Sequence, residues 1–231
     1  MKESTKLKIY HCFFPNKCPC CKRVIPAIDL FCKECFENFK ATETGERCKV
    51  CFSLNSKCEC KKYPKFYFRS IAPFKYQTPL KNAIISFKRV KNIRLASFFA
   101  EYIVNMIAKK YKNVQFDAII PVPLHKSRRR QRGFNQSELL CNELSKRLKV
   151  PVLNNVLHQV KRAQSQHTLN FKQRRQNVKG IYKTTSIPIE YQRVLLVDDI
   201  MTSCSTLNEC AKVLRIEGVT KIYCATIAKT E

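Results

Sequence analysis

The chain has 231 residues, 45% of them hydrophobic, and carries a formal net charge of +27. This length suffices for one full domain and a small module, and the apolar content excludes wholesale disorder. Residues 1–66 contain 14 basic and 7 acidic residues, which leaves 30 basic and 10 acidic residues for 67–231. The excess favours polyanionic partners such as nucleic acid, nucleotide phosphates or an anionic membrane surface, although Lys-rich solvated surfaces are also common.

Neither the N-terminal stretch nor the most apolar window of the sequence suggests a membrane segment. The N-terminal stretch MKESTKLKIYHCFF lacks the continuous apolar core of a signal peptide. The most apolar long window, residues 93–108, contains Arg94, Glu101 and Asn105 and is too short and too polar for a membrane span. We therefore expect a cytoplasmic protein without a membrane span.

Cysteines are concentrated at the start of the chain, where ten of the 14 lie within the first 60 residues. In a reducing compartment such clusters more often bind metal than form disulfides. Eight of them form close pairs, and zinc takes four thiolates in a tetrahedron, so two structural zinc ions are expected. The pairs are Cys18 and Cys21, Cys32 and Cys35, Cys48 and Cys51, and Cys58 and Cys60.

The short spacers favour sequential use of these cysteines, with the first four on one ion and the last four on the other. An interleaved arrangement stays open, and Cys20 is a possible substitute ligand in the first pair. We expect a small zinc-ribbon module over residues 1–66, ending in the linker KKYPKF, and a second domain over 67–231. A further hypothesis is that the zinc module binds other proteins.

The second domain begins with segments of mixed type. Residues 67–76 alternate enough for a strand pair or a hairpin. A helix is expected after Thr78 as N-cap, with Pro79 at its first position. Apolar residues at helical spacing predict a buried helix over 92–111.

Strands and helices then alternate. We expect a strand over 116–124, a basic loop over 125–136, a helix over 137–148 and a possible strand over 156–162, followed by a helix and a strand within 170–182. A strand over 193–199, a helix over 205–218 closed by Gly218, and a last strand over 221–229 complete the chain. This alternation predicts an α/β fold with a doubly wound, mainly parallel sheet, whose ligands bind beyond the carboxyl ends of the strands.

One such strand end carries two adjacent acids, Asp198 and Asp199, followed by hydroxylated residues. A turn before a helix exposes backbone N–H groups that favour a phosphate, and the hydroxyls can add hydrogen bonds. The carboxylates suit ribose hydroxyls or Mg²⁺. Together these groups indicate a ribose 5-phosphate site, whereas the alternative is a plain strand–turn–helix with capping side chains. The turn residues are Thr202, Ser203, Cys204, Ser205 and Thr206.

The stretch VLLVDDIMTSCST resembles the phosphoribosyl pyrophosphate motif of type I phosphoribosyltransferases. Together with PVPLHKSRRRQRGFNQSELL, QHTLNFKQRRQNVKGIY and the paired cysteines, it resembles the ComF family, which joins a zinc ribbon to a phosphoribosyltransferase-type domain and is linked to DNA uptake in natural competence. The resemblance implies phosphoribosyl pyrophosphate with Mg²⁺ as ligand and a competence helicase as a partner.

The resemblance also implies roles for single residues. The acids Asp198 and Asp199 would hold the ribose hydroxyls, and residues 202–206 would hold the 5-phosphate. A mobile flap would carry Arg174 and Arg175. The cations for the pyrophosphate would be Arg128, Arg129, Arg130 and Arg132.

The turn departs from the family pattern Thr-Thr-Gly-x-Thr, because Ser203 replaces the second Thr and Cys204 replaces Gly. A side chain at this position disfavours positive φ, at roughly 1–3 kcal/mol if that conformation is needed. Whether the chain is an enzyme therefore stays open. The competing hypothesis is a single-stranded-DNA-binding protein that reuses the fold, through its basic segments and the aromatic residues Phe134, Phe171 and Tyr182.

Overall fold

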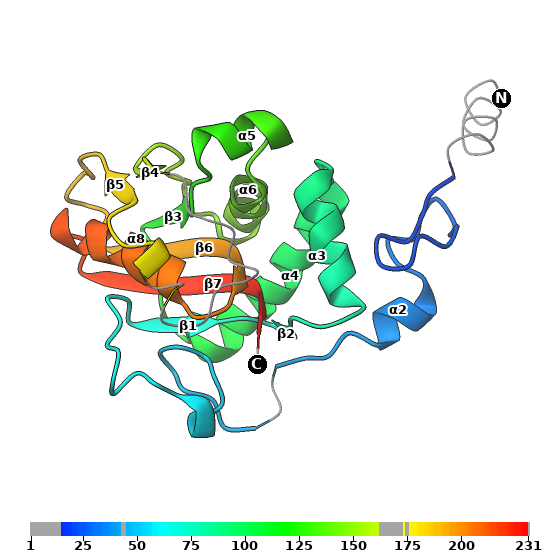
Figure 1. Cartoon of the computed structure of the whole chain (residues 1–231), viewed down its shortest axis with the longest axis horizontal. Coiled ribbons are helices and arrows are strands. Elements are labelled where there is room, and N and C mark those ends of the chain that lie inside the picture. The colour runs from blue at the N-terminus through cyan, green and yellow to red at the C-terminus, as the bar shows by residue number, and fades with distance from the viewer. Residues whose placement is uncertain (1–14, 43–44, 162–172, 174–175, 231) are drawn as a thin grey trace.

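A parallel sheet forms the centre of the larger part of the chain in the computed structural model, which describes residues 15–42, 45–161, 173 and 176–230 (Figure 1). Its order is β1-β7-β6-β3, with β2 also paired to β7, and all of these pairings are parallel. The predicted mainly parallel sheet is therefore confirmed. The strands are β1 (Arg69–Ile71), β2 (Phe74–Lys75), β3 (Ala118–Pro121), β6 (Arg193–Met201) and β7 (Lys221–Lys229).

The central strands β6 and β7 are almost continuously apolar because both faces of a parallel sheet are covered. Residues 194–197 of β6 are fully buried, and every residue of β7 after Lys221 is buried. The predicted strand over 221–229 is reproduced in full. Strand β6 continues for two residues beyond its predicted end at 199, so Asp198 and Asp199 lie inside the strand, close to its carboxyl end.

Helices cover both faces of this sheet, as a doubly wound fold requires. Figure 1 shows α8 in front of the sheet and α4 behind it. Helix α4 packs against α6, and α6 packs on β3 and β6, while α8 packs on β6 and β5. The helices are α2 (Lys33–Glu37), α3 (Leu80–Arg89), α4 (Ile93–Lys110), α5 (Lys126–Arg132), α6 (Gln136–Leu148) and α8 (Ser205–Ile216), with the 3-10 turn η1 (Asn55–Lys57). In the part of the chain described, no helix has the length and apolar character needed to cross a bilayer.

Local sequence signals explain where the two long helices begin. Asn92 caps α4, since its side chain accepts a hydrogen bond from Leu95 N at 3.0 Å. Asn135 caps α6 in the same way, accepting from Ser137 N at 3.0 Å. Such caps satisfy backbone donors that the first turn leaves without partners. Both helices begin within one residue of their predicted starts.

A small antiparallel pair, β4 (Leu157–Gln159) and β5 (Tyr182–Thr184), lies apart from the main sheet. Strand β5 packs beside α8. The possible strand at 156–162 is thus confirmed, and the strand expected near Tyr182 is present.

Three local predictions are wrong. Residues 67–76 form no hairpin, because β1 and β2 both pair in parallel with β7. The basic segment predicted as a loop forms the helix α5, which ends at Gly133 with a left-handed φ of 79°. Pro79 stands one residue before the first residue of α3 rather than inside it. The pairing at the sheet edge depends on tertiary contacts, and the end of α5 depends on a glycine stop signal. Apolar periodicity predicts neither feature.

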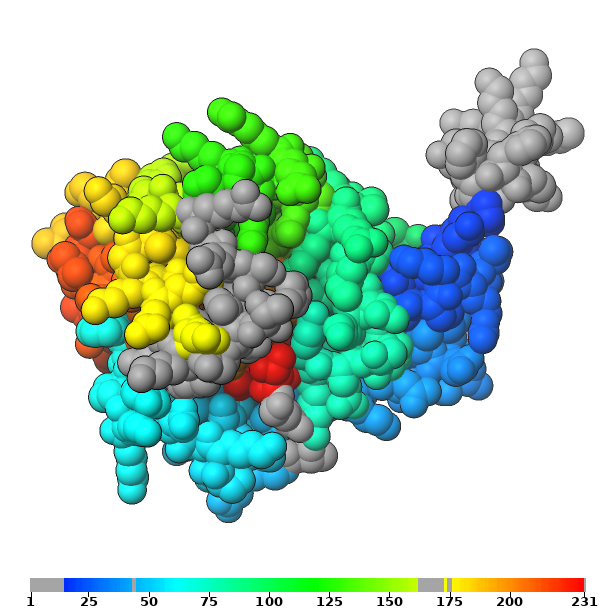
Figure 2. Space-filling model, viewed as in Figure 1, coloured from blue at the N-terminus to red at the C-terminus, as the bar shows by residue number. Residues whose placement is uncertain are grey.

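The cysteine-rich segments pack against different parts of the larger domain. Figure 1 places α2 and the first group of cysteines beside α3, and the second group below β1. In Figure 2 residues 45–66, light blue to cyan, follow the lower edge of the domain, while the blue residues 15–40 lie at the opposite end of this face. Arg94 of α4 donates to Ala27 O at 3.0 Å, which fixes the first group.

Candidate functional site

The acid pair Asp198 and Asp199 lies near the carboxyl end of β6, between β3 and β7. Successive residues of a strand point to opposite faces, so the two carboxylates leave the strand on different sides. Asp199 is 6% exposed, and Asp198 is half-buried. Two acids at one buried strand end are costly unless cations or donors surround them.

Asp199 has such partners from two helices. Its Oδ2 lies 2.9 Å from Lys88 Nζ of α3 and accepts a hydrogen bond from Gln136 Nε2 at 2.8 Å. Gln136 is the first residue of α6, and its Oε1 accepts from Arg132 Nη1. The carboxylate, the amide and the two cations thus form one connected network below the basic helix α5.

Asp198 is held by weaker donors. Its Oδ1 accepts from Asp199 N at 2.8 Å and from Ser137 Oγ at 3.4 Å. Burial, and next the charge of Asp199, raise the pKa of Asp198 to about 7, against the opposing effects of the backbone hydrogen bond and of Lys88. The carboxyl therefore titrates near neutral pH, and a ligand with hydroxyl donors or a cation would favour its charged form.

The turn from β6 into α8 has a left-handed residue directly before the helix. Cys204, at the N-cap of the 12-residue helix α8, has φ 62° and ψ 8°, which is left-handed. Ser203 Oγ and Ser205 Oγ lie 2.8 Å apart and bond to each other. Thr202 and Thr206 are half-buried. The four predicted hydroxyls are therefore brought together at the helix N-terminus, with two of them already paired.

The side chain of Cys204 points away from solvent and against the cysteine-rich part of the chain. The residue is 5% exposed, and its Sγ lies 3.6 Å from Cys51 O. Burial raises the pKa of its thiol, while Lys229 and Tyr67 act in the opposite direction. The left-handed conformation that glycine would favour is thus adopted by a cysteine, at a cost of roughly 1–2 kcal/mol. The thiol fills space between two parts of the chain.

The four candidate arginines of 125–136 have different surroundings. Arg132 is half-buried and bonds to Gln136, and burial lowers its pKa while Asp199 opposes this effect. Arg129 is bound to Glu138 through two contacts of 2.8 and 3.1 Å. Arg128 is half-buried and Arg130 is exposed. Only Arg132 joins the hydrogen-bonded network around the acids.

The eight paired cysteines form two groups of four, in the sequential grouping that the short spacers favour. Within each group the sulfur atoms lie within 4.8 Å of one another. A tetrahedral zinc with Zn–S bonds of about 2.3 Å needs sulfurs about 3.8 Å apart. The measured distances Cys21–Cys32 of 3.7 Å, Cys48–Cys60 of 3.9 Å and Cys51–Cys58 of 3.7 Å match this value. The donor set therefore fits zinc.

The two groups begin with the same backbone knuckle. Lys22 N donates to Cys18 O, and Phe52 N donates to Cys48 O, both at 2.9 Å. Lys22 and Phe52 both have positive φ, at 68° and 57°. Burial raises the pKa of Cys18, but backbone hydrogen bonds outweigh it and lower the pKa to about 6. Burial raises the pKa of Cys20 to about 12, and Cys20 lies outside both groups of four.

Several contacts of this site escape sequence reasoning. Lys88, Gln136 and Ser137 reach the acids from helices that are 61 or more residues away in sequence. Gln136 and Ser137 could have been predicted from the polar Asn-Gln-Ser sequence that begins a helix at the same edge of the sheet. The flap residues Arg174 and Arg175, and Phe171, lie outside the described residues.

Comparison with known proteins finds one matching family and three similar proteins. Residues 135–231 match the phosphoribosyl transferase domain family. The chain is 45% identical to Competence protein F of Haemophilus influenzae over 49% of this chain and 50% of that protein. It is 27% identical to DNA utilization protein YhgH of Escherichia coli O157:H7 over 92% of this chain and 90% of that protein. It is 26% identical to Competence protein ComFC of Bacillus subtilis over 63% and 57% of the two chains.

The domain match covers β6, the acid pair, the turn and α8, but not Lys88 of α3, which pairs with Asp199. The match with Competence protein F spans half the length of that relative, whereas the match with YhgH spans nearly all of both chains. The paired cysteines precede the matched domain. The chain is thus similar to competence and DNA utilization proteins of the ComF type, and its cysteine-rich N-terminal part precedes a domain of the phosphoribosyltransferase type.

Proposed function

We propose that the chain binds phosphoribosyl pyrophosphate, or a related ribose 5-phosphate, at the carboxyl end of β6. The ribose hydroxyls would bond to Asp198 and Asp199, and the 5-phosphate to the 202–206 turn. The observation that carries this proposal is the acid pair placed directly before a left-handed turn and a helix N-terminus. Phosphate on the turn and a diol on the acids match the two chemistries of a ribose 5-phosphate.

The free positions of the acids support this arrangement. Among the described residues, the contacts of Asp199 use Oδ2, and those of Asp198 use Oδ1. We assign the other oxygen of each carboxylate to a ribose hydroxyl. Carboxylates accept such hydrogen bonds well, since charge-assisted bonds are about twice as strong as neutral ones.

The pyrophosphate would lie toward α5, where Arg128, Arg130 and Arg132 supply positive charge. Arg129 is the least suited of the four, because Glu138 already binds its guanidinium at two points. We also propose Arg174 and Arg175 as flap residues. When bound, Mg²⁺ would neutralise charge on the pyrophosphate.

Zinc is proposed as the structural metal of both cysteine groups. Each group offers four sulfurs at tetrahedral spacing, which is the closed coordination of a structural site. The two ions would join segments that have little apolar core of their own. We propose a boundary between this module and the larger domain near residue 66.

The biological role proposed is the handling of DNA during uptake. It rests on the relatives named for competence and DNA utilization. A competence helicase is a candidate partner, and a cytoplasmic location is part of this proposal. The claim concerns binding, and no acceptor substrate or catalytic residue is assigned.

Calorimetry with phosphoribosyl pyrophosphate and Mg²⁺ tests the ligand proposal. Wild type should bind, and the double variant Asp198→Asn with Asp199→Asn should lose binding while its zinc content stays unchanged. Equal affinity in both proteins would remove the acids from the site. No binding by wild type would show that the turn has lost its ligand.

A second candidate function is binding of single-stranded DNA. An open cavity of about 360 Å³ on α5 is lined by Lys126, Arg129, Arg130 and Gly133. Its cations suit a phosphate backbone, and affinity should then fall steeply with salt because neutralised phosphates release counterions. Replacing Arg128, Arg129 and Arg130 by Ala should weaken binding and flatten that dependence. Unchanged binding in this variant would exclude α5 as the contact.

A further inference from the structure

A second cavity lies where the second cysteine group meets the 202–206 turn. We call it the junction cavity. It has a volume of about 210 Å³, and its walls come from residues 47–65, from the turn and from the end of β7. Neither Asp198 nor Asp199 is among its lining residues. Thr202, Ser203 and Cys204 do line it, so the cavity borders the 202–206 turn on the side away from the acid pair's own contacts and shares that turn with the proposed 5-phosphate position.

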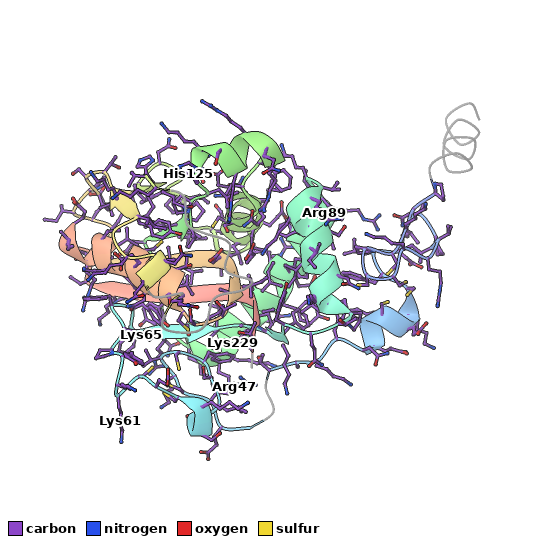
Figure 3. All side chains as sticks on the ribbon, in the orientation of Figure 1. Arg47, Lys61, Lys65, Arg89, His125 and Lys229 are labelled. Atoms are coloured by element: carbon purple, nitrogen blue, oxygen red, sulfur yellow. The ribbon has the colours of Figure 1, made fainter. Side chains whose placement is uncertain are left out.

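Four cations line the junction cavity against a single acid, Glu59. They come from two parts of the chain: Arg47, Lys57 and Lys65 from the cysteine module, and Lys229 from β7. Figure 3 shows Arg47, Lys65 and Lys229 at the border between the module and the strand ends, while Lys61 lies at the periphery. Cations that gather from distant segments into one cavity favour an anionic ligand.

The negative charge of the proposed metal centre cancels part of the positive charge of these cations. Cys51 and Cys60 also line the cavity, and a zinc ion with four thiolates carries net negative charge. Part of the positive charge therefore offsets this centre. Four cations still exceed the combined charge of Glu59 and the metal site, so the cavity keeps a positive excess.

The backbone of the module is fixed against the larger domain at this point. Three consecutive carbonyls of the second knuckle, those of residues 49–51, face the domain. Ser70 N donates to the first at 3.3 Å, Ser70 Oγ to the second at 2.5 Å, and the Cys204 thiol contacts the third at 3.6 Å. These contacts fix the backbone of the knuckle against β1 and the turn before any ligand arrives, which lowers the entropic cost of ordering this wall of the cavity.

Lys229 shows how the two sides share the cavity. It is 4% exposed, and its Nζ donates to Thr202 O at 2.7 Å and to Thr230 O at 3.1 Å. The positive charge is thereby held against the turn. Hydroxyls of Ser53, Thr202 and Ser203 also line the cavity and add donors beside the cations.

We propose that the junction cavity is an anion site that binds a phosphate or pyrophosphate group, with Lys57, Lys65, Arg47 and Lys229 as its cations. The volume is below the range of about 300–1,000 Å³ for pockets that hold drug-sized molecules, so a small anion fits better than a nucleoside. The site uses the cysteine module as one wall. Its four cations lie outside the residues assigned to the ribose 5-phosphate, although the two sites share the 202–206 turn.

The test is a titration of the full zinc-loaded chain with inorganic pyrophosphate in the absence of Mg²⁺. The double variant Lys57→Gln with Lys65→Gln should bind at least about tenfold more weakly, since each charged contact removed is substantial. Lys61→Gln with Lys62→Gln is the matched control, because these lysines have the same charge, lie in the same module and do not line the cavity. The control should retain wild-type affinity.

Glu59→Gln gives a result that misfolding cannot imitate. Removing the one lining acid should tighten pyrophosphate binding by about threefold. A parallel titration with ribose 5-phosphate distinguishes a free anion from the terminal phosphate of a sugar. If the cavity holds the phosphate of a sugar, the Lys57/Lys65 variant should lose affinity for both ribose 5-phosphate and pyrophosphate. If it holds a free anion, the variant should lose affinity for pyrophosphate alone.

Three results would overturn the proposal. Wild type could fail to bind pyrophosphate at millimolar concentration, which would leave the cations to the metal centre alone. The Lys57/Lys65 variant could bind as well as the control. Asp198→Asn with Asp199→Asn could gain or lose pyrophosphate affinity as strongly as the cavity variant, which would place the anion at the acid pair instead.

Discussion

Lys88→Met tests whether this lysine is the internal counterion of the acid pair. Lys88 Nζ lies 2.9 Å from Asp199 Oδ2, with side-chain exposures of 28% and 8% for the two residues. Breaking a buried pair costs about 3–5 kcal/mol of folding free energy. Because Lys88 is partly exposed and Gln136 still donates to Asp199, we expect a loss of about 2–3 kcal/mol at pH 8.

The pH dependence of this loss has a definite sign. The folded-state pKa of Asp198 is raised to about 7, above the value of about 3.9 for an unfolded aspartate. Its deprotonation therefore costs folded-state stability as the pH rises from about 4 to about 7, and Lys88 offsets part of that cost. Below pH 6 Asp198 is mostly protonated, so the loss caused by Lys88→Met should be smaller at pH 5.5 than at pH 8.

Urea unfolding at pH 5.5 and pH 8 measures both effects. Lys81→Met is the matched control, since Lys81 is exposed on the same helix α3. It should change the unfolding free energy by no more than about 0.5 kcal/mol. A loss in Lys88→Met no larger than that of the control would refute the counterion role, and an equal loss at both pH values would refute the effect of Lys88 on Asp198.

Three further predictions concern the metal, the turn and DNA. Elemental analysis should find about two zinc ions per chain in wild type and about one in Cys48→Ser. The affinity of Cys48→Ser for phosphoribosyl pyrophosphate should also fall, because the knuckle contacts the turn. Cys204→Gly removes the left-handed cost but leaves a void, so thermal unfolding should report a net change within about 1 kcal/mol and no large gain in ligand affinity. Arg129→Ala with Lys126→Ala should weaken binding of a single-stranded oligonucleotide and leave phosphoribosyl pyrophosphate bound, in a salt series followed by fluorescence anisotropy.

Contradictory outcomes are equally clear for each of these. Full zinc content in Cys48→Ser would exclude that thiol as a ligand. A tenfold gain in ligand affinity for Cys204→Gly would mean that the cysteine obstructs the phosphate. Oligonucleotide affinity that ignores both substitutions on α5 would locate DNA binding elsewhere.

The central strands β6 and β7 could be predicted because they are long and mostly apolar. Residues 221–229 and the helix over 92–111 carry signals that local sequence alone supplies. The helix α5 was missed because KSRRRQR has no apolar face, although Gly133 is the residue that ends it in the left-handed conformation. The parallel pairing of β1 with β7 joins segments about 150 residues apart, which no local pattern encodes.

The site was predictable only in part for the same reason. The acids and hydroxyls stand together in the sequence, so their chemistry could be interpreted. Lys88 and Gln136 reach Asp199 from other helices, and Cys51 O meets Cys204 across the chain. The sequence indicated a conformational problem at Cys204, and the structure shows that packing against the second knuckle accompanies the left-handed turn.

A structure of the full chain with phosphoribosyl pyrophosphate and Mg²⁺ tests the central claim most directly. The account predicts the 5-phosphate within about 2.7–3.2 Å of backbone nitrogens of the 202–206 turn, with ribose hydroxyls on Asp198 and Asp199. A ligand bound only along α5 or away from β6, with both acids still contacting protein groups alone, would contradict it.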